Sequence, residues 1–302
     1  MNGSVSAMKT NNIRAVAFDA DDTLWALQNH FLDVEREYCQ LLAPFGDSEK
    51  ITASLFETEM SNMTDLGYGC KAFIISLVEN AVKVSEGRVE ARVIGEIVKL
   101  GKRLLHVDAC PLDGVEPTLS RLHDLKHADG SRRYRLAVFT KGELMDQENK
   151  LRRSSLLRFF DVVSIVSDKT PEAYHALCSQ LAVNPDELLM VGNSFKSDIA
   201  PALAIGAYAA HIPFHTNWAH ETTEEFEHES AFGVSPISRK YWISLSRDKF
   251  WLLSLYPFYI HWFLFSRTQC FDRAHLLRCV TGVTLAEVNR GQISLPPLLS
   301  FL

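Results

Sequence analysis

Short apolar runs alternate with helical patterns over much of this chain. Residues 13–18 (IRAVAF) lie between polar Asn12 and Asp19 and predict a buried strand. Similar runs predict further strands at 134–139, 161–166, 187–191 and 207–212. Helical spacing predicts helices at 115–125, 143–153, 171–181 and 197–204. Repeated βα units of this kind predict a parallel sheet with helices on both faces.

Residues 27–107 differ because their apolar positions keep helical spacing throughout, as in the series Val93, Ile97, Leu100 and Leu104. A stretch of roughly 80 residues is far longer than an ordinary crossover between strands. We therefore expect a helical insertion. The predicted division is an arm at 1–12, a core at 13–25 plus 108–235, helices at 26–107 and an atypical tail at 236–302.

Polar side chains follow four of the predicted strands. They are Asp19–Thr23, Thr140–Gly142, Ser167–Lys169, and Gly192–Ser194 with Asp198 further on. In open parallel sheets, ligands bind at the carboxyl ends of the strands. Any one of these groups could be a helix cap. Together they predict an active site that gathers carboxylates, a hydroxyl, lysines and an amide at one rim.

In this order the motifs resemble those of the haloacid dehalogenase-like (HAD) hydrolase superfamily. The likeness is to phosphatase-type members with a helical cap inserted after the first motif, and it covers about residues 13–235. It implies an α/β fold, with a three-layer Rossmann-like parallel sheet core and an inserted all-helical cap domain. Such a cap would close over the substrate and exclude water.

The resemblance implies a role for each strand-end residue. Asp19 matches the nucleophile and Asp21 the general acid/base, while Thr140 and Lys169 match the residues that hold the phosphoryl group. Lys141 is a further candidate for binding substrate. A carboxylate has a reference pKa near 4, so we expect Asp19 to be an anion that needs no activating base. A phosphate at ~4 Å would repel it by about 4 kcal/mol, which positive charge must offset.

The resemblance also implies Mg²⁺ as the cofactor. Asp19, the backbone carbonyl of Asp21, Asn193 and Asp198 are the expected protein ligands. Magnesium takes about six oxygens and keeps several of them as water. Asn193 stands where the family usually has Asp, which lowers the charge of the site by one. We therefore expect weaker binding of the metal, with Asp198 contributing more.

These residues predict a magnesium-dependent phosphatase that hydrolyses small phosphorylated metabolites through an aspartyl-phosphate intermediate. A phosphomutase, a 2-haloacid dehalogenase and a non-catalytic phospho-ligand sensor are the alternatives. Asp21 favours phosphate esters, because the dehalogenase members lack an acidic residue at that position. Asn193 is the one feature that favours a sensor.

Residues near the ends of the expected core leave two further questions. Trp25, Asn29 and His30 follow the first motif, where they could contact substrate or pack in the hinge to the helices. Four histidines follow the last predicted strand at positions 211, 215, 220 and 228. Their spacing does not suit a second metal site, so we interpret them as loop histidines.

Composition narrows the class of protein. Hydrophobic residues make up 47% and charged residues 23%, which is ordinary for a globular protein. The net charge of −6 argues against a nucleic-acid partner. Six cysteines without a CxxC pair suggest reduced thiols, and the first residues lack the apolar run of a signal peptide. We therefore expect a cytoplasmic protein, whose oligomeric state and exact substrate the sequence leaves open.

The tail differs in character from the rest. Residues 236–302 hold eight basic and three acidic side chains, and three of the five tryptophans. Residues 250–265 (FWLLSLYPFYIHWFLF) are strongly apolar, but they are shorter than a membrane span and contain Pro257. Three interpretations stay open: a frame change or unstructured appendage, a packed accessory helix, and contact with a membrane.

Overall fold

The computed structural model describes residues 12–214, 231–233, 244–245 and 250–251. All of them belong to one compact unit, Met1–Leu252. The predicted arm at 1–11 lies outside the described residues, as do His215, His220 and His228. The tail at 236–302 lies outside them too, apart from two short strands, and so do its three interpretations.

Six parallel strands form the sheet, in the order β3-β2-β1-β4-β5-β6. Their bounds are β1 Ala15–Phe18, β2 Arg135–Lys141, β3 Val162–Val166, β4 Leu188–Gly192, β5 Tyr208–His211 and β6 Ala231–Gly233. Strand β1 lies between β2 and β4, with Ala17 opposite Ala137 on one side and Met190 on the other. All of its residues are buried, as expected for a strand covered on both faces. The parallel sheet predicted from the sequence is confirmed.

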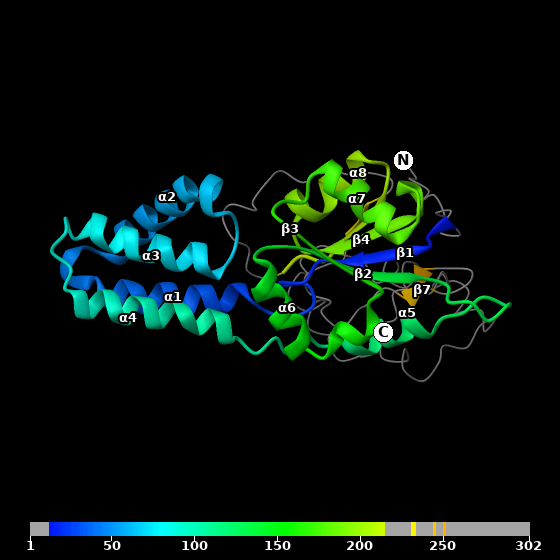
Figure 1. The fold of residues 1–302 in the computed structure, drawn as a ribbon, viewed down its shortest axis with the longest axis horizontal. Helices are drawn as coiled ribbons and strands as arrows, with labels where there is room; N and C mark the ends of the chain where they lie inside the picture. The colour runs from blue at the N-terminus through cyan, green and yellow to red at the C-terminus, as the bar shows by residue number, and fades with distance from the viewer. Residues whose placement is uncertain (1–11, 215–230, 234–243, 246–249, 252–302) are drawn as a thin grey trace, which may run out of the picture. The chain divides into compact units, whose positions relative to one another are not determined.

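Helices cover both faces of this sheet (Figure 1). Helices α5 (Val115–Asp124) and α6 (Leu144–Arg153) lie on one side, and α7 (Pro171–Leu181) and α8 (Ala200–Ala204) lie on the other. Alternate residues of β1 supply the two apolar layers: Val16 and Phe18 pack in the first cluster, and Ala15 and Ala17 in the second. The three-layer α/β core is therefore confirmed.

Four helices lie between β1 and α5 in the chain. They are α1 Gln28–Leu41, α2 Ser48–Leu66, α3 Cys70–Val84 and α4 Ala91–Lys102. They share an apolar cluster of their own, which includes Tyr38, Leu77 and Ile97. Packing of α3 against α4 is tight, since a Cβ on Gly101 would lie 2.5 Å from a side-chain carbon of Ile74. No strand interrupts residues 26–107, all of which the structure describes.

Shorter elements complete the described chain. Single 3₁₀ turns lie at Ala43–Phe45, Arg103–His106, Leu156–Phe159 and Pro185–Glu187, and a π-helical turn, η6, lies at Phe195–Ile199. Strands β7 (Ser244–Leu245) and β8 (Phe250–Trp251) form an antiparallel pair. The helix expected over 197–204 is therefore α8 preceded by the π turn, and Asp198 lies in that turn.

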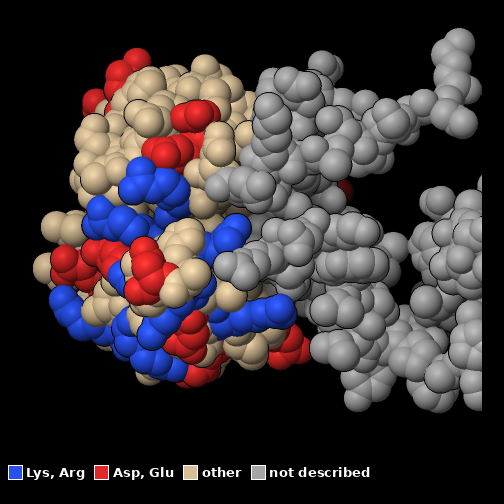
Figure 2. Space-filling view, turned by 90° about the vertical axis from the view of Figure 1, so that its right-hand side faces the viewer, with Lys and Arg blue, Asp and Glu red and all other residues tan. Residues whose placement is uncertain are grey.

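The described surface carries charges of both signs. On the face shown in Figure 2, basic and acidic side chains are interspersed, which is typical of a solvated surface. None of the helices in the described part of the chain is long and apolar enough to cross a membrane. The four cysteines that fall there, Cys39, Cys70, Cys110 and Cys178, are free thiols.

Candidate active site

Three strand ends bring Asp19, Lys169 and Asp198 together. Asp19 follows β1, and its backbone N–H donates to the carbonyl of Val191 in β4 at 2.9 Å. The Lys169 ammonium donates to Oδ1 of Asp19 at 2.5 Å and to Oδ1 of Asp198 at 2.6 Å. All three side chains are buried, so a single ammonium links two carboxylates away from solvent. The structure thus brings Asp19 and Lys169 together, as expected from their positions at the ends of parallel strands.

Burial changes the ionisation of this cluster. It raises the pKa of Asp19 to about 7, against the lowering effect of Lys169, and the charge of Asp198 adds to the rise. Burial by itself lowers the pKa of Lys169, but Asp19 and Asp198 outweigh it and raise that pKa above its usual value. The expectation of an ordinary Asp19 pKa near 4 is therefore wrong for the protein without a bound cation. Positive charge beyond Lys169 would lower this pKa and favour the ionised form of Asp19 at neutral pH.

Gly192 and the π turn η6 place Asp198. A Cβ on Gly192 would lie 2.2 Å from Oδ2 of Asp198, so this carboxylate packs directly on the glycine backbone. Its Oδ2 accepts from the backbone N–H of Ser194 at 2.9 Å, and the Tyr174 hydroxyl donates to its backbone carbonyl at 2.8 Å. The side chain is thus fixed toward Lys169.

The side-chain amide of Asn193 lies among oxygen atoms that could together bind a cation. One of its terminal amide atoms is 3.2 Å from Oδ2 of Asp19, the backbone carbonyl of Asp21 and the hydroxyl of Thr23. Ligands on adjacent corners of a magnesium octahedron are about 3 Å apart, given bonds of 2.0–2.1 Å. When the amide oxygen faces this point, three oxygens converge and the donor set fits Mg²⁺. Without a cation, the amide N–H₂ group can donate to the same oxygens.

Few charged side chains are available to bind a magnesium ion at this point. No group of three His, Cys, Asp or Glu side chains gathers as metal ligands in the described ranges. A magnesium site here would rest on the carboxylates of Asp19 and Asp198, the amide of Asn193 and the carbonyl of Asp21. Both oxygens of Asp198 already accept hydrogen bonds, from Lys169 and from Ser194. The larger contribution predicted for Asp198 stays a prediction.

Asp21 is held by side chains that the sequence reasoning largely missed. Its carboxylate accepts from the Trp25 indole N–H at 2.7 Å, from Nε2 of Gln147 at 2.7 Å, and from Nζ of Lys150 at 2.8 and 2.9 Å. Lys150 is 1% exposed. Burial alone lowers the pKa of Lys150, but Asp21 and Asp146 raise it above its usual value, so the group is an ammonium. The available signal was the position of Gln147 and Lys150, three residues apart on the helix after Thr140.

A second group of buried side chains packs against the contact between Asp21 and Lys150. Lys150 is 3.3 Å from Oδ2 of Asp146, which also accepts from the thiol of Cys70 at 3.5 Å. Burial raises the pKa of that thiol far above its usual range, so Cys70 is a neutral donor. Oδ1 of Asp146 and Oε1 of Gln147 have no hydrogen-bond partner among the described residues, although both are buried.

The predicted substrate-binding residues separate into two groups. Thr140 and Lys141 line the same cavity as Asp19. Lys141 donates to the Ser197 hydroxyl at 2.7 Å, and its Nζ lies 4.0 Å from the centre of the Tyr68 ring.

Trp25 and His30 do not line the cavity where a substrate would bind. Trp25 is fully buried in the sheet core, and its indole acts through Asp21. His30 is exposed on α1 and does not line the cavity, and neither does Asn29. The hinge interpretation suits Trp25. Three residues before Trp25, the carboxylate of Asp22 accepts from the backbone N–H of Leu27 at 2.8 Å, just before α1 begins.

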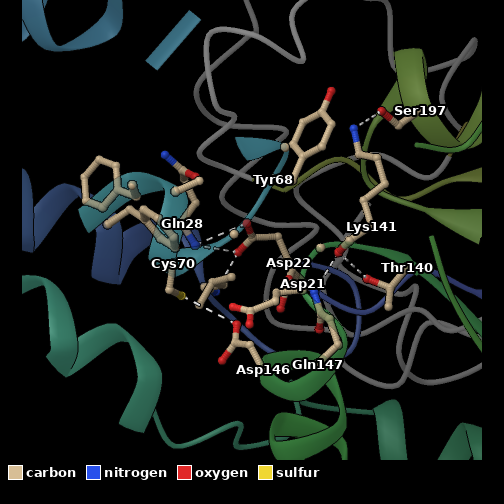
Figure 3. A pocket seen from close by; sticks show the side chains of 18 of the residues that line it. Asp21, Asp22, Gln28, Tyr68, Cys70, Thr140, Lys141, Asp146, Gln147 and Ser197 are labelled. Atoms are coloured by element: carbon tan, nitrogen blue, oxygen red, sulfur yellow. Dashed lines mark hydrogen bonds between the residues drawn. The ribbon is translucent and has the colours of Figure 1, made fainter. Parts of the chain in front are cut away.

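The site opens into a cavity of about 220 Å³. Its floor is formed by the strand ends, with Asp19, Asp21, Thr140 and Lys169. Its other walls come from α1, α2, α3 and the loop that joins α2 to α3. Figure 3 shows Asp21, Asp22 and Gln147 from the core side around this space. Gln28 and Cys70 reach it from α1 and α3, and Tyr68 from the loop between α2 and α3.

A buried carboxylate joined to a lysine at the ends of parallel strands, with a second aspartate two residues on, defines a class of α/β enzymes with a carboxylate nucleophile. A family model for haloacid dehalogenase-like hydrolases matches residues 13–206, and the chain belongs to this family. The prediction of a hydrolase is thus confirmed.

Known proteins resemble this chain over most of its described length. The N-acylneuraminate-9-phosphatases of mouse and human are each 24% identical over 216 residues, covering 67% of this chain and 83% of theirs. A haloacid dehalogenase-like family hydrolase from Xanthomonas campestris is 30% identical, with a TM-score of 0.62 over 68% of this chain and 84% of its own. A 2-haloacid dehalogenase from Pseudomonas syringae pv. Tomato shares the fold, with 18% identity and a TM-score of 0.50 over 74% and 94%.

Proposed function

We propose that this protein is a cytoplasmic, magnesium-dependent phosphatase that hydrolyses small phosphorylated metabolites through an aspartyl-phosphate on Asp19. The observation that carries the proposal is the arrangement of two aspartates in one cavity, each joined to its own buried lysine. Asp19 contacts Lys169, and Asp21 contacts Lys150. The mouse and human relatives, both phosphatases by name, support the same chemistry.

In the first half-reaction an oxygen of Asp19 attacks phosphorus, and the bond from phosphorus to the ester oxygen breaks. Asp21 gives its proton to the leaving alkoxide. Lys169 and Thr140 bind the phosphoryl oxygens, where charge develops. In the second half-reaction Asp21 takes a proton from water, which attacks the phosphorus of the aspartyl-phosphate. Inorganic phosphate leaves and Asp19 is free again.

Magnesium, when bound, would supply positive charge next to the nucleophile and the transferring phosphoryl group. Asp19, Asn193, Asp198 and the backbone carbonyl of Asp21 would hold it. That charge matters here because burial raises the pKa of Asp19 to about 7 and one lysine is shared between two carboxylates. Asn193 contributes an oxygen without a charge, so the phosphatase should need more magnesium than its Asn193→Asp variant.

Helices α1–α4 act in this proposal as the cap. Of these, α1, α2 and α3 supply the walls of the cavity opposite the strand ends, and α3 reaches the core at its first turn, where Lys71 pairs with Glu143. A roof of this kind favours small substrates, because a large one could not be enclosed. The predicted division into core and cap thus becomes part of the proposal.

The test is phosphate release from a panel of small esters, including N-acylneuraminate 9-phosphate, with magnesium and with EDTA. Asp19→Asn and Asp21→Asn should each abolish metal-dependent turnover, and Asp65→Asn, an exposed aspartate of α2 outside the cavity, should not. Turnover that survives Asp19→Asn would contradict the mechanism.

The same samples test the alternatives. Isomerised product in place of phosphate would show a mutase. Halide release from 2-chloropropionate would show a dehalogenase. Binding of esters without any turnover would show a sensor.

A further inference from the structure

The charges that line the cavity are unevenly distributed. Its lysines all come from the core: Lys141 and Lys169 lie at strand ends, and Lys150 lies in α6. Within the described residues that line it from α1, α2, α3 and their loop, the charged side chains are Glu35 and Glu59, and there is no Lys, Arg or His. All the positive charge of the lining therefore lies on the core side, beside the carboxylates found there, while the helices contribute negative charge alone. The core carboxylates are Asp19, Asp21, Asp22, Glu143, Asp146 and Asp198.

An apolar wall accompanies the two glutamates. Phe31 of α1 and Phe73 of α3 pack with their ring centres 5.0 Å apart, and both line the cavity with Met63 of α2. Aromatic faces beside carboxylates attract organic ammonium groups and also accept the carbon skeleton of a hydroxylated molecule. They offer nothing to an anion.

Two buried acceptors point to the same chemistry. Oδ1 of Asp146 and Oε1 of Gln147 have no donor within the described part of the protein, and both residues line the cavity. Asp146 is 6% exposed and Gln147 is 2% exposed. Buried acceptors without a partner are costly, so a ligand or the water that it carries should supply the missing donors. A hydroxyl or an ammonium group can do this, and a carboxylate cannot.

We propose that the substrate is a phosphate monoester whose alcohol part carries hydroxyl or ammonium groups and no anionic group. This inference rests on the proposed phosphatase function. Lys169 and Thr140 bind the phosphate, while Glu35, Glu59 and the free acceptors of Asp146 and Gln147 receive the alcohol part. A carboxylate there would face like charges, with no cation among the described residues that these helices and their loop add to the lining, so such esters bind poorly and turn over slowly.

Three esters with two-carbon alcohols test the proposal, because they differ mainly in the charge at the far end. They are 2-aminoethyl phosphate, 2-hydroxyethyl phosphate and carboxymethyl phosphate. We expect kcat/KM for the first two to exceed that for carboxymethyl phosphate at least tenfold. A kcat/KM for the carboxylate ester equal to or above the others overturns the proposal. p-Nitrophenyl phosphate serves as a general probe of phosphate release. If it and all three esters are inert in folded protein, the proposed phosphatase function fails as well.

Variants connect the preference to the helices. Glu35→Gln together with Glu59→Gln should reduce the ratio of amine to carboxylate kcat/KM at least threefold, mainly through KM. Glu57→Gln is the matched control, since this exposed glutamate lies on the same helix as Glu59, pairs with Lys83 and does not line the cavity. An unchanged ratio in the double variant, or an equal change in the control, contradicts the assignment.

Discussion

Replacing Lys150 with Met tests whether one buried ammonium stabilises the acidic half of the site. Methionine has nearly the length of lysine, so the change removes the charge without leaving a large cavity. The ammonium lies 2.8 and 2.9 Å from the two oxygens of Asp21 and 3.3 Å from Asp146. In Lys150→Met both carboxylates lose their cation, while Asp146 stays buried.

The size of the effect follows from burial. Removing one partner of a buried pair costs about 3–5 kcal/mol, and the lower end applies because the Asp21 side chain is 23% exposed. The pKa of Lys150 is raised on folding, so its stabilisation is complete below about pH 10 and is lost only as pH rises through the folded pKa. At pH 7.5 we expect the free energy of unfolding to fall by about 3 kcal/mol. With a urea slope of about 2–3 kcal/mol/M, the midpoint should drop by about 1–1.5 M.

Two further variants make the measurement decisive. Lys83→Met removes an exposed lysine that pairs with Glu57, and it should change the free energy of unfolding by less than about 1 kcal/mol. Adding Asp146→Asn to Lys150→Met removes one of the unpaired carboxylates and should restore part of the loss. A midpoint for Lys150→Met within 0.3 M (about the effect of a surface change) of the unchanged protein would refute the reasoning, as would a double variant that is no more stable than the single one.

Three other outcomes are expected. Gly95→Ala should raise the free energy of unfolding by about 0.5–1 kcal/mol, because its Cβ meets nothing within 4 Å. Gly101→Ala should lower the free energy of unfolding by about 1–3 kcal/mol, because its Cβ would lie 2.5 Å from Ile74. Equal thermal midpoints for the two variants would contradict this packing. Magnesium affinity measured by calorimetry should rise about fivefold from pH 6 to pH 7, since the proton on Asp19 competes with the metal; a flat profile would contradict the raised pKa. Gly192→Ala should displace Asp198 and lower kcat/KM at least tenfold without unfolding the protein, and full activity would contradict that contact.

Much of the core was predictable, because its strands are apolar runs that end at polar residues. The strand predicted at 13–18 is β1 at Ala15–Phe18, and the one at 161–166 is β3 at Val162–Val166. Strand β6, Ala231–Gly233, was missed because three residues beside an acidic stretch carry no periodic signal. The four helices of 27–107 were predicted only as a block, since continuous helical spacing does not show where one helix ends.

Site residues that directly follow a strand could be predicted from the sequence, and those placed by packing within a helix could not. Asp19 and Lys169 could be placed together because parallel strands end at the same edge. Lys150 was not singled out, since nothing in its spacing tells a buried lysine from an exposed one. Trp25 showed the opposite difficulty: a tryptophan next to the motif suggested contact with substrate, but its ring fills the core and only its N–H reaches the site.

The difference between the two aspartates explains how one short motif can carry two kinds of chemistry. Asp19 shares the ammonium of Lys169 with Asp198 in a buried cluster, and burial raises its pKa to about 7. Asp21, two residues on, accepts from three N–H donors, and one of these is the ammonium of Lys150, which also lies 3.3 Å from Asp146. In the proposed mechanism, Asp19 is therefore the residue that a bound cation would serve, and Asp21 is held by the three donors of the protein itself. Pairs of carboxylates with such different surroundings are how enzymes separate nucleophile from acid.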